Sequence, residues 1–154
     1  MSASLNHVGV IVDDLDESIR FYEEMFGLEQ LPAPAFNVPV AWLRAGELQV
    51  HLTERSGPHS GHFALTVDDL GAVYRRATEM GSLWSDELAR AVFILPSGEV
   101  QLYVLDPSGN VIEANHHDAE RWRDEIPGMV EHADLVPQFP GAAEATLFLS
   151  RTAS

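Results

Sequence analysis

The 154-residue sequence has a formal net charge of −15 at pH 7, and its nine basic residues are all arginine. The absence of cysteine excludes disulfides, thiolate nucleophiles and thiolate metal sites, and the absence of lysine excludes Schiff-base chemistry. The acidic balance argues against a nucleic-acid partner, because phosphate binding depends on a basic surface.

The longest apolar run near the start, "VGVIV" at 8–12, is far too short to cross a bilayer. The first residues also lack the basic-then-apolar layout of a secretion signal. We therefore expect a soluble cytoplasmic protein with no membrane partner.

In chain order, the first predicted elements are a strand over 7–12 and a helix over 15–26. Asp13 and Asp14 supply an N-cap and early acidic charge, and Gly27 ends the helix. Strands follow in "VAWLRAG" at 40–46 and "ELQVHLTE" at 47–54. The predicted order is a strand, a helix and about three strands.

The same order then repeats with an offset of 55 residues. "GHFALTVDDL" at 61–70 matches "NHVGVIVDDL" at 6–15, which places His62 on His7. The later strands are expected in "EVQLYVL" at 99–105 and "NVIEANH" at 110–116. A fixed offset is the signature of a duplicated unit, so we predict an α+β fold of two βαβββ modules forming a curved mixed sheet. The modules span about 4–54 and 60–117, within a single domain over 1–117.

Alternation along the strands predicts which side chains share a face. Val8, Val10 and Val12 are expected under the first helix, and Phe63, Leu65 and Val67 under the second. His7 and His62 then point the other way, toward whatever the sheet encloses. On the last strand of each module, "LQVHLT" places Gln49, His51 and Thr53 on one face, and "VIEAN" does the same for Val111, Glu113 and Asn115.

Residues 118–154 lie outside the repeat and form a C-terminal extension. "ERWRDEI" predicts a short helix, and the segment around His132 reads as irregular surface. "EATLFL" at 144–149 is either one more strand or an arm that covers the cavity or reaches a second subunit.

The repeat, its two histidines and "DPSGNVIE" at 106–113 resemble the vicinal oxygen chelate superfamily of glyoxalases, bleomycin-resistance proteins and extradiol dioxygenases. The resemblance covers roughly residues 4–117. It implies a sheet that curls around one divalent metal, a substrate with two neighbouring oxygens, and a homodimer. By family position the metal ligands are His7, His51, His62 and Glu113, with His51 standing where glyoxalases carry a glutamate. Fe, Zn, Mn, Ni and Co all suit imidazole and carboxylate ligands.

Other residues are candidates for supporting roles. Glu113 and His51 are the first candidates for catalysis, and Glu47 is a candidate base. Tyr103 is a candidate acid, by resemblance to the tyrosine of extradiol enzymes. Candidate substrate contacts are Arg44, Gln49 and Asn115.

Three functions fit this pattern. The leading one is a glyoxalase- or epimerase-like lyase or isomerase that stabilises an enolate-type intermediate. The first alternative is an Fe(II) extradiol ring-cleaving dioxygenase, and the second is a protein that sequesters a drug or metabolite. His51 discriminates between the first two, because a fourth protein ligand leaves an octahedral ion too few positions for a catechol and dioxygen together.

Overall fold

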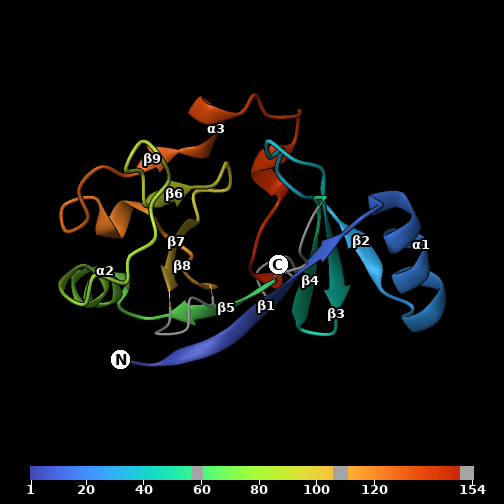
Figure 1. The fold of residues 1–154 in the computed structure, drawn as a ribbon, viewed down its shortest axis with the longest axis horizontal. Helices are drawn as coiled ribbons and strands as arrows, with labels where there is room; N and C mark the ends of the chain where they lie inside the picture. The colour runs from blue at the N-terminus through green and yellow to red at the C-terminus, as the bar shows by residue number, and fades with distance from the viewer. Residues whose placement is uncertain (57–60, 106–110, 150–154) are drawn as a thin grey trace.

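A computed structural model describes residues 1–56, 61–105 and 111–149 of the chain (Figure 1). The turn expected at "DPSGN", residues 106–110, lies outside the described residues. The first module contains β1 (Ala3–Val12), α1 (Leu15–Phe26), β2 (Glu29–Leu31), β3 (Val40–Ala45) and β4 (Leu48–Glu54). The second contains β5 (His62–Val67), α2 (Leu70–Glu79), β6 (Val92–Ile94), β7 (Val100–Leu105) and β8 (Val111–His116).

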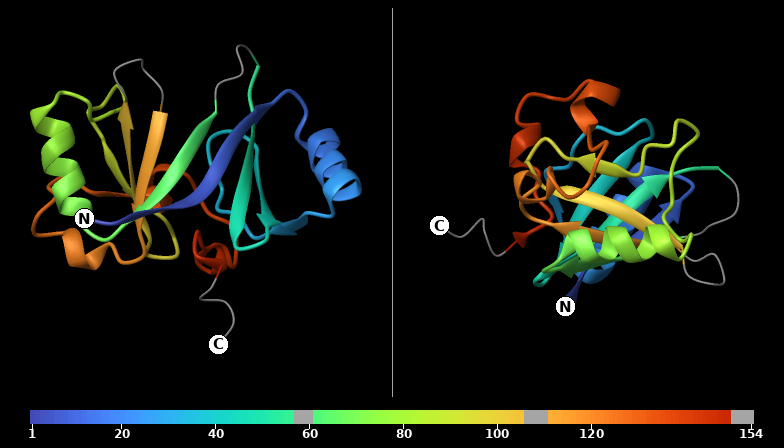
Figure 2. Two further views of the ribbon diagram at one scale, coloured as in Figure 1. Left: turned by 90° about the horizontal axis from the view of Figure 1, so that it is seen from below. Right: turned by 90° about the vertical axis from the view of Figure 1, so that its left-hand side faces the viewer.

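One sheet joins the two modules in the order β2-β3-β4-β1-β5-β8-β7-β6-β9. In each module the first strand runs parallel to the last, and β1 and β5 pair antiparallel at the centre. The sheet bends into a U, with α1 and α2 outside its two arms (Figures 1 and 2). The predicted pair of βαβββ modules is confirmed.

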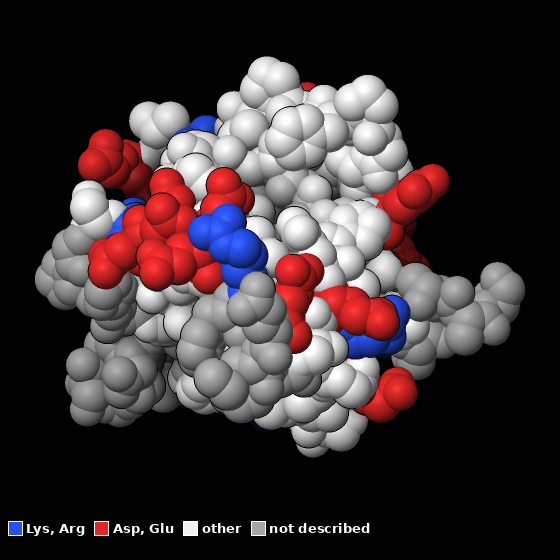
Figure 3. All heavy atoms as spheres, turned by 90° about the vertical axis from the view of Figure 1, so that its right-hand side faces the viewer, with Lys and Arg blue, Asp and Glu red and all other residues white. Residues whose placement is uncertain are grey.

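Both helices begin as their sequences predict. The Asp14 carboxylate accepts from the backbone N–H of Glu17, and that of Asp69 accepts from Ala72, each at 2.8 Å. Gly27 follows α1 with a φ of 67°, a conformation that glycine adopts at little cost. The end of the molecule that carries α1 shows many more acidic than basic side chains (Figure 3).

Each helix covers an apolar cluster on the outer face of the sheet. Val10 and Val12 pack with Leu52 and the apolar side of α1, while Val67 packs with Leu102 near α2. The expectation that Val8 and Phe63 lie under the helices is wrong, because these two are 42% and 40% exposed. They face each other across β1 and β5, midway between the helices, where neither helix reaches them (Figure 2).

The C-terminal extension folds back over the open side of the U (Figure 1). It contains the 3₁₀ turn η1 (Glu120–Trp122), β9 (Val130–Glu131), α3 (His132–Leu135) and the 3₁₀ turn η2 (Ala142–Glu144). β9 adds to the sheet edge beside β6, and His132 is buried rather than on the surface as expected. Residues 145–149 form an arm, not a strand. No described helix has the length and hydropathy needed to cross a membrane.

Candidate metal centre and cavity

Three side chains from three neighbouring strands meet on the inner face of the sheet. Nε2 of His7 on β1 lies 3.1 Å from Nε2 of His62 on β5 and 3.1 Å from Oε2 of Glu113 on β8. Nε2 of His62 lies 3.3 Å from the same carboxylate oxygen. Three donors with these separations fit three adjacent positions around a divalent ion with bonds of about 2.0–2.3 Å, the usual range for such ligands.

The hydrogen bonds of Asn6 show which ring nitrogen of His7 carries the proton and which one presents a lone pair to the centre. The Asn6 amide nitrogen donates to the carbonyl of Leu147 and to the Thr66 hydroxyl, each at 3.1 Å, so the amide oxygen must face His7. That oxygen lies 2.7 Å from Nδ1 of His7, which therefore carries the proton. In the neutral ring Nε2 is then an electron-pair donor directed at a carboxylate and a second imidazole, an arrangement that a bound cation stabilises.

The Glu113 carboxylate is also oriented by hydrogen bonds from behind the centre. Its Oε1 accepts from the Asn115 amide at 3.0 Å, and the Asn115 oxygen accepts from Thr66 at 2.9 Å. Burial by itself raises the pKa of the Glu113 carboxyl, but the adjacent His7 and His62 rings hold that pKa well below its usual range. The carboxylate is thus ionised and oriented for a metal.

His62 approaches the centre by crossing directly over Gly9, its register partner on β1. A Cβ added at Gly9 would lie well inside van der Waals contact with the His62 ring. A glycine inside a strand is often a sign of such a close approach, and this signal in the sequence was missed.

His51 does not join the three-residue group. Its ring is sandwiched between His7, at 3.8 Å between ring centroids, and Trp42, at 4.2 Å. The Gln49 amide donates to the carbonyl of Thr146 at 2.9 Å, so its oxygen faces Nε2 of His51, 2.7 Å away. The nitrogen facing Gln49 is therefore protonated and not a metal donor. Burial, and then the neighbouring His7, lower the pKa of His51 well below its usual range, which keeps the ring neutral.

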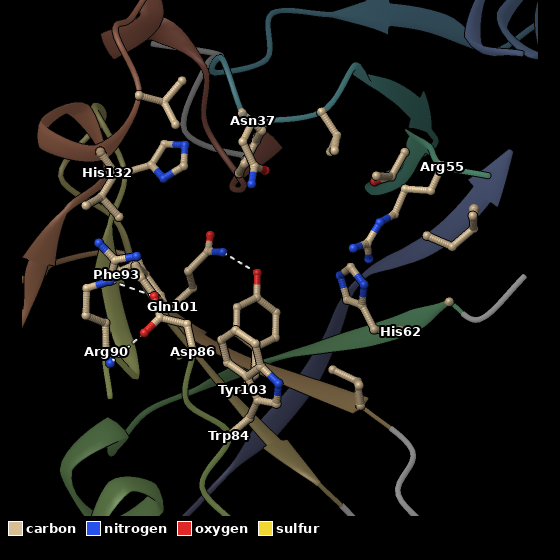
Figure 4. A pocket seen from close by; sticks show the side chains of 18 residues that line it. Asn37, Arg55, His62, Trp84, Asp86, Arg90, Phe93, Gln101, Tyr103 and His132 are labelled. Carbon is tan, nitrogen blue, oxygen red and sulfur yellow. Dashed lines mark hydrogen bonds and ion pairs between the residues drawn. The ribbon is translucent and has the colours of Figure 1, made fainter. Parts of the chain in front are cut away.

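The centre opens into a cavity between the arms of the U. An inner chamber of about 140 Å³ is lined by His51, His62 and Glu113. It shares walls with an outer chamber of about 620 Å³. The extension contributes His132 to the outer wall (Figure 4). It contributes Leu147 to the inner wall. A small molecule in the inner chamber can thus reach His62 and Glu113, whereas His7 is fully buried and lines neither chamber.

Tyr103 and Gln101 line both chambers, and the Gln101 amide donates to the Tyr103 hydroxyl (Figure 4). Burial, and then the charge of Glu113, raise the pKa of Tyr103 well above its usual range. The phenol is therefore protonated at neutral pH, and its role as an acid stays a prediction. Gln101 was not anticipated from the sequence.

Arg55 supplies a positive charge to the outer wall, beside His62 (Figure 4). The other arginine of this wall, Arg90, forms an ion pair with Asp86 at 2.6 Å, whereas no ion pair with Arg55 is found in the described part of the chain. Arg55 follows directly after β4, a position whose sequence carries no signal of a cavity.

Besides the buried ligand His7, four predicted residues line neither chamber. Glu47 is exposed in the turn between β3 and β4, and Arg44 lies opposite Gln49 at that end of the strands. Gln49 and Asn115 are buried behind the centre, where they hold His51 and Glu113 instead of contacting a substrate. Glu47 and Arg44 therefore lie outside the walls of both chambers.

Comparison with known proteins agrees with this architecture. The family model for the Glyoxalase/Bleomycin resistance protein/Dioxygenase superfamily matches residues 4–114. The chain belongs to this superfamily. It is 30% identical over 125 residues to the uncharacterised protein YwbC of Bacillus subtilis, a match that covers 73% of this chain and 97% of YwbC.

Two further similarities are to proteins with named activities. Glyoxylase I 4 of Arabidopsis thaliana is 28% identical over 131 residues, covering 75% of this chain and 72% of the plant protein. The crystal structure of methylmalonyl-CoA epimerase from Mycobacterium tuberculosis superposes with a TM-score of 0.58 at 23% identity, covering 72% of this chain and 85% of the epimerase. The epimerase supports the fold.

A side chain at Gly9 should displace His62 and so weaken metal binding. We expect Gly9→Ala to reduce the affinity for Co²⁺ at least tenfold, about 1.4 kcal/mol, as measured by calorimetric titration. Val8→Ala is the matched control, because Val8 precedes Gly9 on β1 and its side chain is 42% exposed, outside the buried centre. Equal affinities of the Gly9→Ala variant and the unchanged protein would contradict the close approach.

The neutral, buried His51 predicts how stability depends on pH. In the unfolded chain its imidazole titrates near 6.5, whereas the folded protein resists protonation. Below that pH the unfolded state binds the extra proton, so folding free energy is lost as the pH falls. Between pH 7.5 and 5.5 we expect His51 to account for a loss of about 1 kcal/mol, measured by urea unfolding of metal-free protein. The His51→Gln variant should show a correspondingly smaller loss, and equal losses would contradict the assignment.

Proposed function

We propose that the chain is a divalent-metal enzyme of the glyoxalase type, a lyase or isomerase that moves a proton beside a carbonyl. Its substrate is a small molecule with two neighbouring oxygens. The observation that carries the proposal is the convergence of three electron-pair donors, His7, His62 and Glu113. Two of them, His62 and Glu113, line the inner chamber.

His7, His62 and Glu113 would hold the ion, and Fe, Zn, Mn, Ni and Co all accept such ligands. When bound, the metal supplies Lewis-acid stabilisation of negative charge on the substrate's oxygens. The burial of His7 and Glu113 strengthens this effect, because electrostatic interactions are screened less away from bulk water.

The chain itself supplies groups for proton transfer. Tyr103 is a protonated phenol on the wall of both chambers, suited to donate to an oxygen that gains charge. His51 is neutral and keeps one lone pair, so it is our candidate base. Arg55 favours a substrate that also carries negative charge. The similarity to Glyoxylase I 4 supports this class of reaction.

The extradiol dioxygenase remains a second candidate because of one observation. His51 lies outside the ligand group, so two imidazoles and one carboxylate would leave three open positions on an octahedral ion. That number accommodates a bidentate catechol and dioxygen. The sequence disfavoured this reaction only because His51 was expected to be a fourth ligand. The homodimer and the cytoplasmic location stay predictions.

Proton exchange tests the proposal without knowledge of the natural substrate. Protein loaded with each candidate metal is incubated in D₂O with a panel of α-hydroxy- and α-oxo-carbonyl compounds, and loss of the C–H signal is followed by proton NMR. We expect exchange with at least one compound, reduced at least 100-fold in His62→Ala and Glu113→Ala. The matched control Glu47→Gln should exchange normally.

A parallel assay follows oxygen uptake with substituted catechols and the Fe(II)-loaded protein. Oxygen uptake together with a ring-cleavage product, and no proton exchange in any sample, would establish the dioxygenase in place of the lyase or isomerase. If stoichiometric metal never binds, the metal-dependent proposal is wrong.

A further inference from the structure

The C-terminal arm, residues 145–149, contacts two side chains behind the metal centre, Asn6 and Gln49, through two consecutive backbone carbonyls. The carbonyl of Thr146 accepts from the Gln49 amide at 2.9 Å, and that of Leu147 accepts from the Asn6 amide at 3.1 Å. Both amides are buried, and each presents its oxygen to a histidine ring of the centre. Residues 146 and 147 lie beyond residues 4–114, the part of the chain that the superfamily model matches.

A backbone carbonyl can only accept a hydrogen bond. It therefore fixes the orientation of the amide that donates to it, and through that amide the tautomer of the histidine ring. Each carbonyl forces the NH₂ group of its amide toward the arm and the amide oxygen toward the ring. The oxygen of Asn6 then requires a proton on Nδ1 of His7, which leaves Nε2 for the metal. The oxygen of Gln49 requires a proton on Nε2 of His51, which withholds that nitrogen from the metal.

The arm is itself firmly attached. The Glu99 carboxylate accepts from the backbone N–H of Leu147 at 2.7 Å and from the Thr146 hydroxyl. Leu147 and Ala145 are buried in an apolar cluster with Trp42, the residue on which the His51 ring stacks. The position of the two carbonyls is therefore determined by contacts on both sides of the arm.

We propose that Thr146 and Leu147 are positioning residues of the metal centre, which set the tautomers of His51 and His7 through the amides of Gln49 and Asn6. In this scheme the extension is a part of the site, and it determines that the centre has three protein ligands rather than four. The inference rests on the proposed metal site, but the tautomers can be measured without metal.

The first test compares the full chain with a chain that ends at Gly141. ¹⁵N NMR of the histidine rings in metal-free protein should show His7 protonated at Nδ1 and His51 at Nε2 in the full chain. In the shortened chain we expect mixed tautomers for His51, because the Gln49 amide loses its acceptor, and a smaller change for His7, because Asn6 keeps its hydrogen bond to Thr66. The affinity for Co²⁺ should be at least tenfold lower by calorimetric titration.

A second variant covers the case in which the shortened chain does not fold. Glu99→Ala keeps the whole chain but removes the acceptor that anchors Thr146 and Leu147, so it should reproduce both effects. Gln138→Ala is the matched control. That amide also joins the extension to the domain, through Ala35 and Val136, and it makes no contact with His7 or His51. It should leave the tautomers unchanged and the Co²⁺ affinity within about twofold, well below the effects known for groups behind metal ligands.

The outcomes separate the two proposals. If the folded shortened chain, or Glu99→Ala, keeps both tautomers and the full affinity, the positioning role is wrong. If the unchanged protein shows the expected tautomers but binds no Co²⁺, the proposed metal site is wrong. The effect of the arm on the two rings is still tested, because the tautomers are measured in metal-free protein.

Discussion

The structure depends on the convergence of two imidazole lone pairs and one carboxylate within 3.3 Å of one another. A bound cation would offset the cost of burying these donors, because His7 and Glu113 are almost wholly removed from water. The fold makes the convergence possible by placing β1, β5 and β8 side by side at the bottom of the U. Duplication supplies the two histidines from equivalent positions, and the parallel pairing of β5 with β8 adds the carboxylate.

Behind the three ligands lies a continuous chain of polar contacts. It runs from the Leu147 carbonyl through Asn6 and Thr66 to Asn115, and ends on Glu113. Every donor in this chain has an acceptor, so the orientation of each group is fixed by its neighbour. The same chain explains why Asn6 and Asn115, which never face the cavity, are buried polar residues.

The sequence predicts the parts of the site that follow from short-range periodicity. Strand alternation places His7, His62 and Glu113 on the inner face without any knowledge of their partners, and the repeat pairs the two histidines. The fate of His51 could not be predicted, since it depends on a carbonyl 95 residues further along the chain, at Thr146. The sequence of the arm has no periodic pattern from which its role could be predicted. Val8 and Phe63 were misplaced because alternation identifies a face but not where a helix ends above it.

The central claim is that His7, His62 and Glu113 bind one metal ion while His51 does not. The most direct measurement is a crystal structure of the Co²⁺-loaded protein with anomalous diffraction at the cobalt edge. The account predicts a single strong peak about 2.0–2.3 Å from Nε2 of both histidines and from the Glu113 carboxylate. A peak bound by His51, or no peak between these three side chains at full loading, would contradict it.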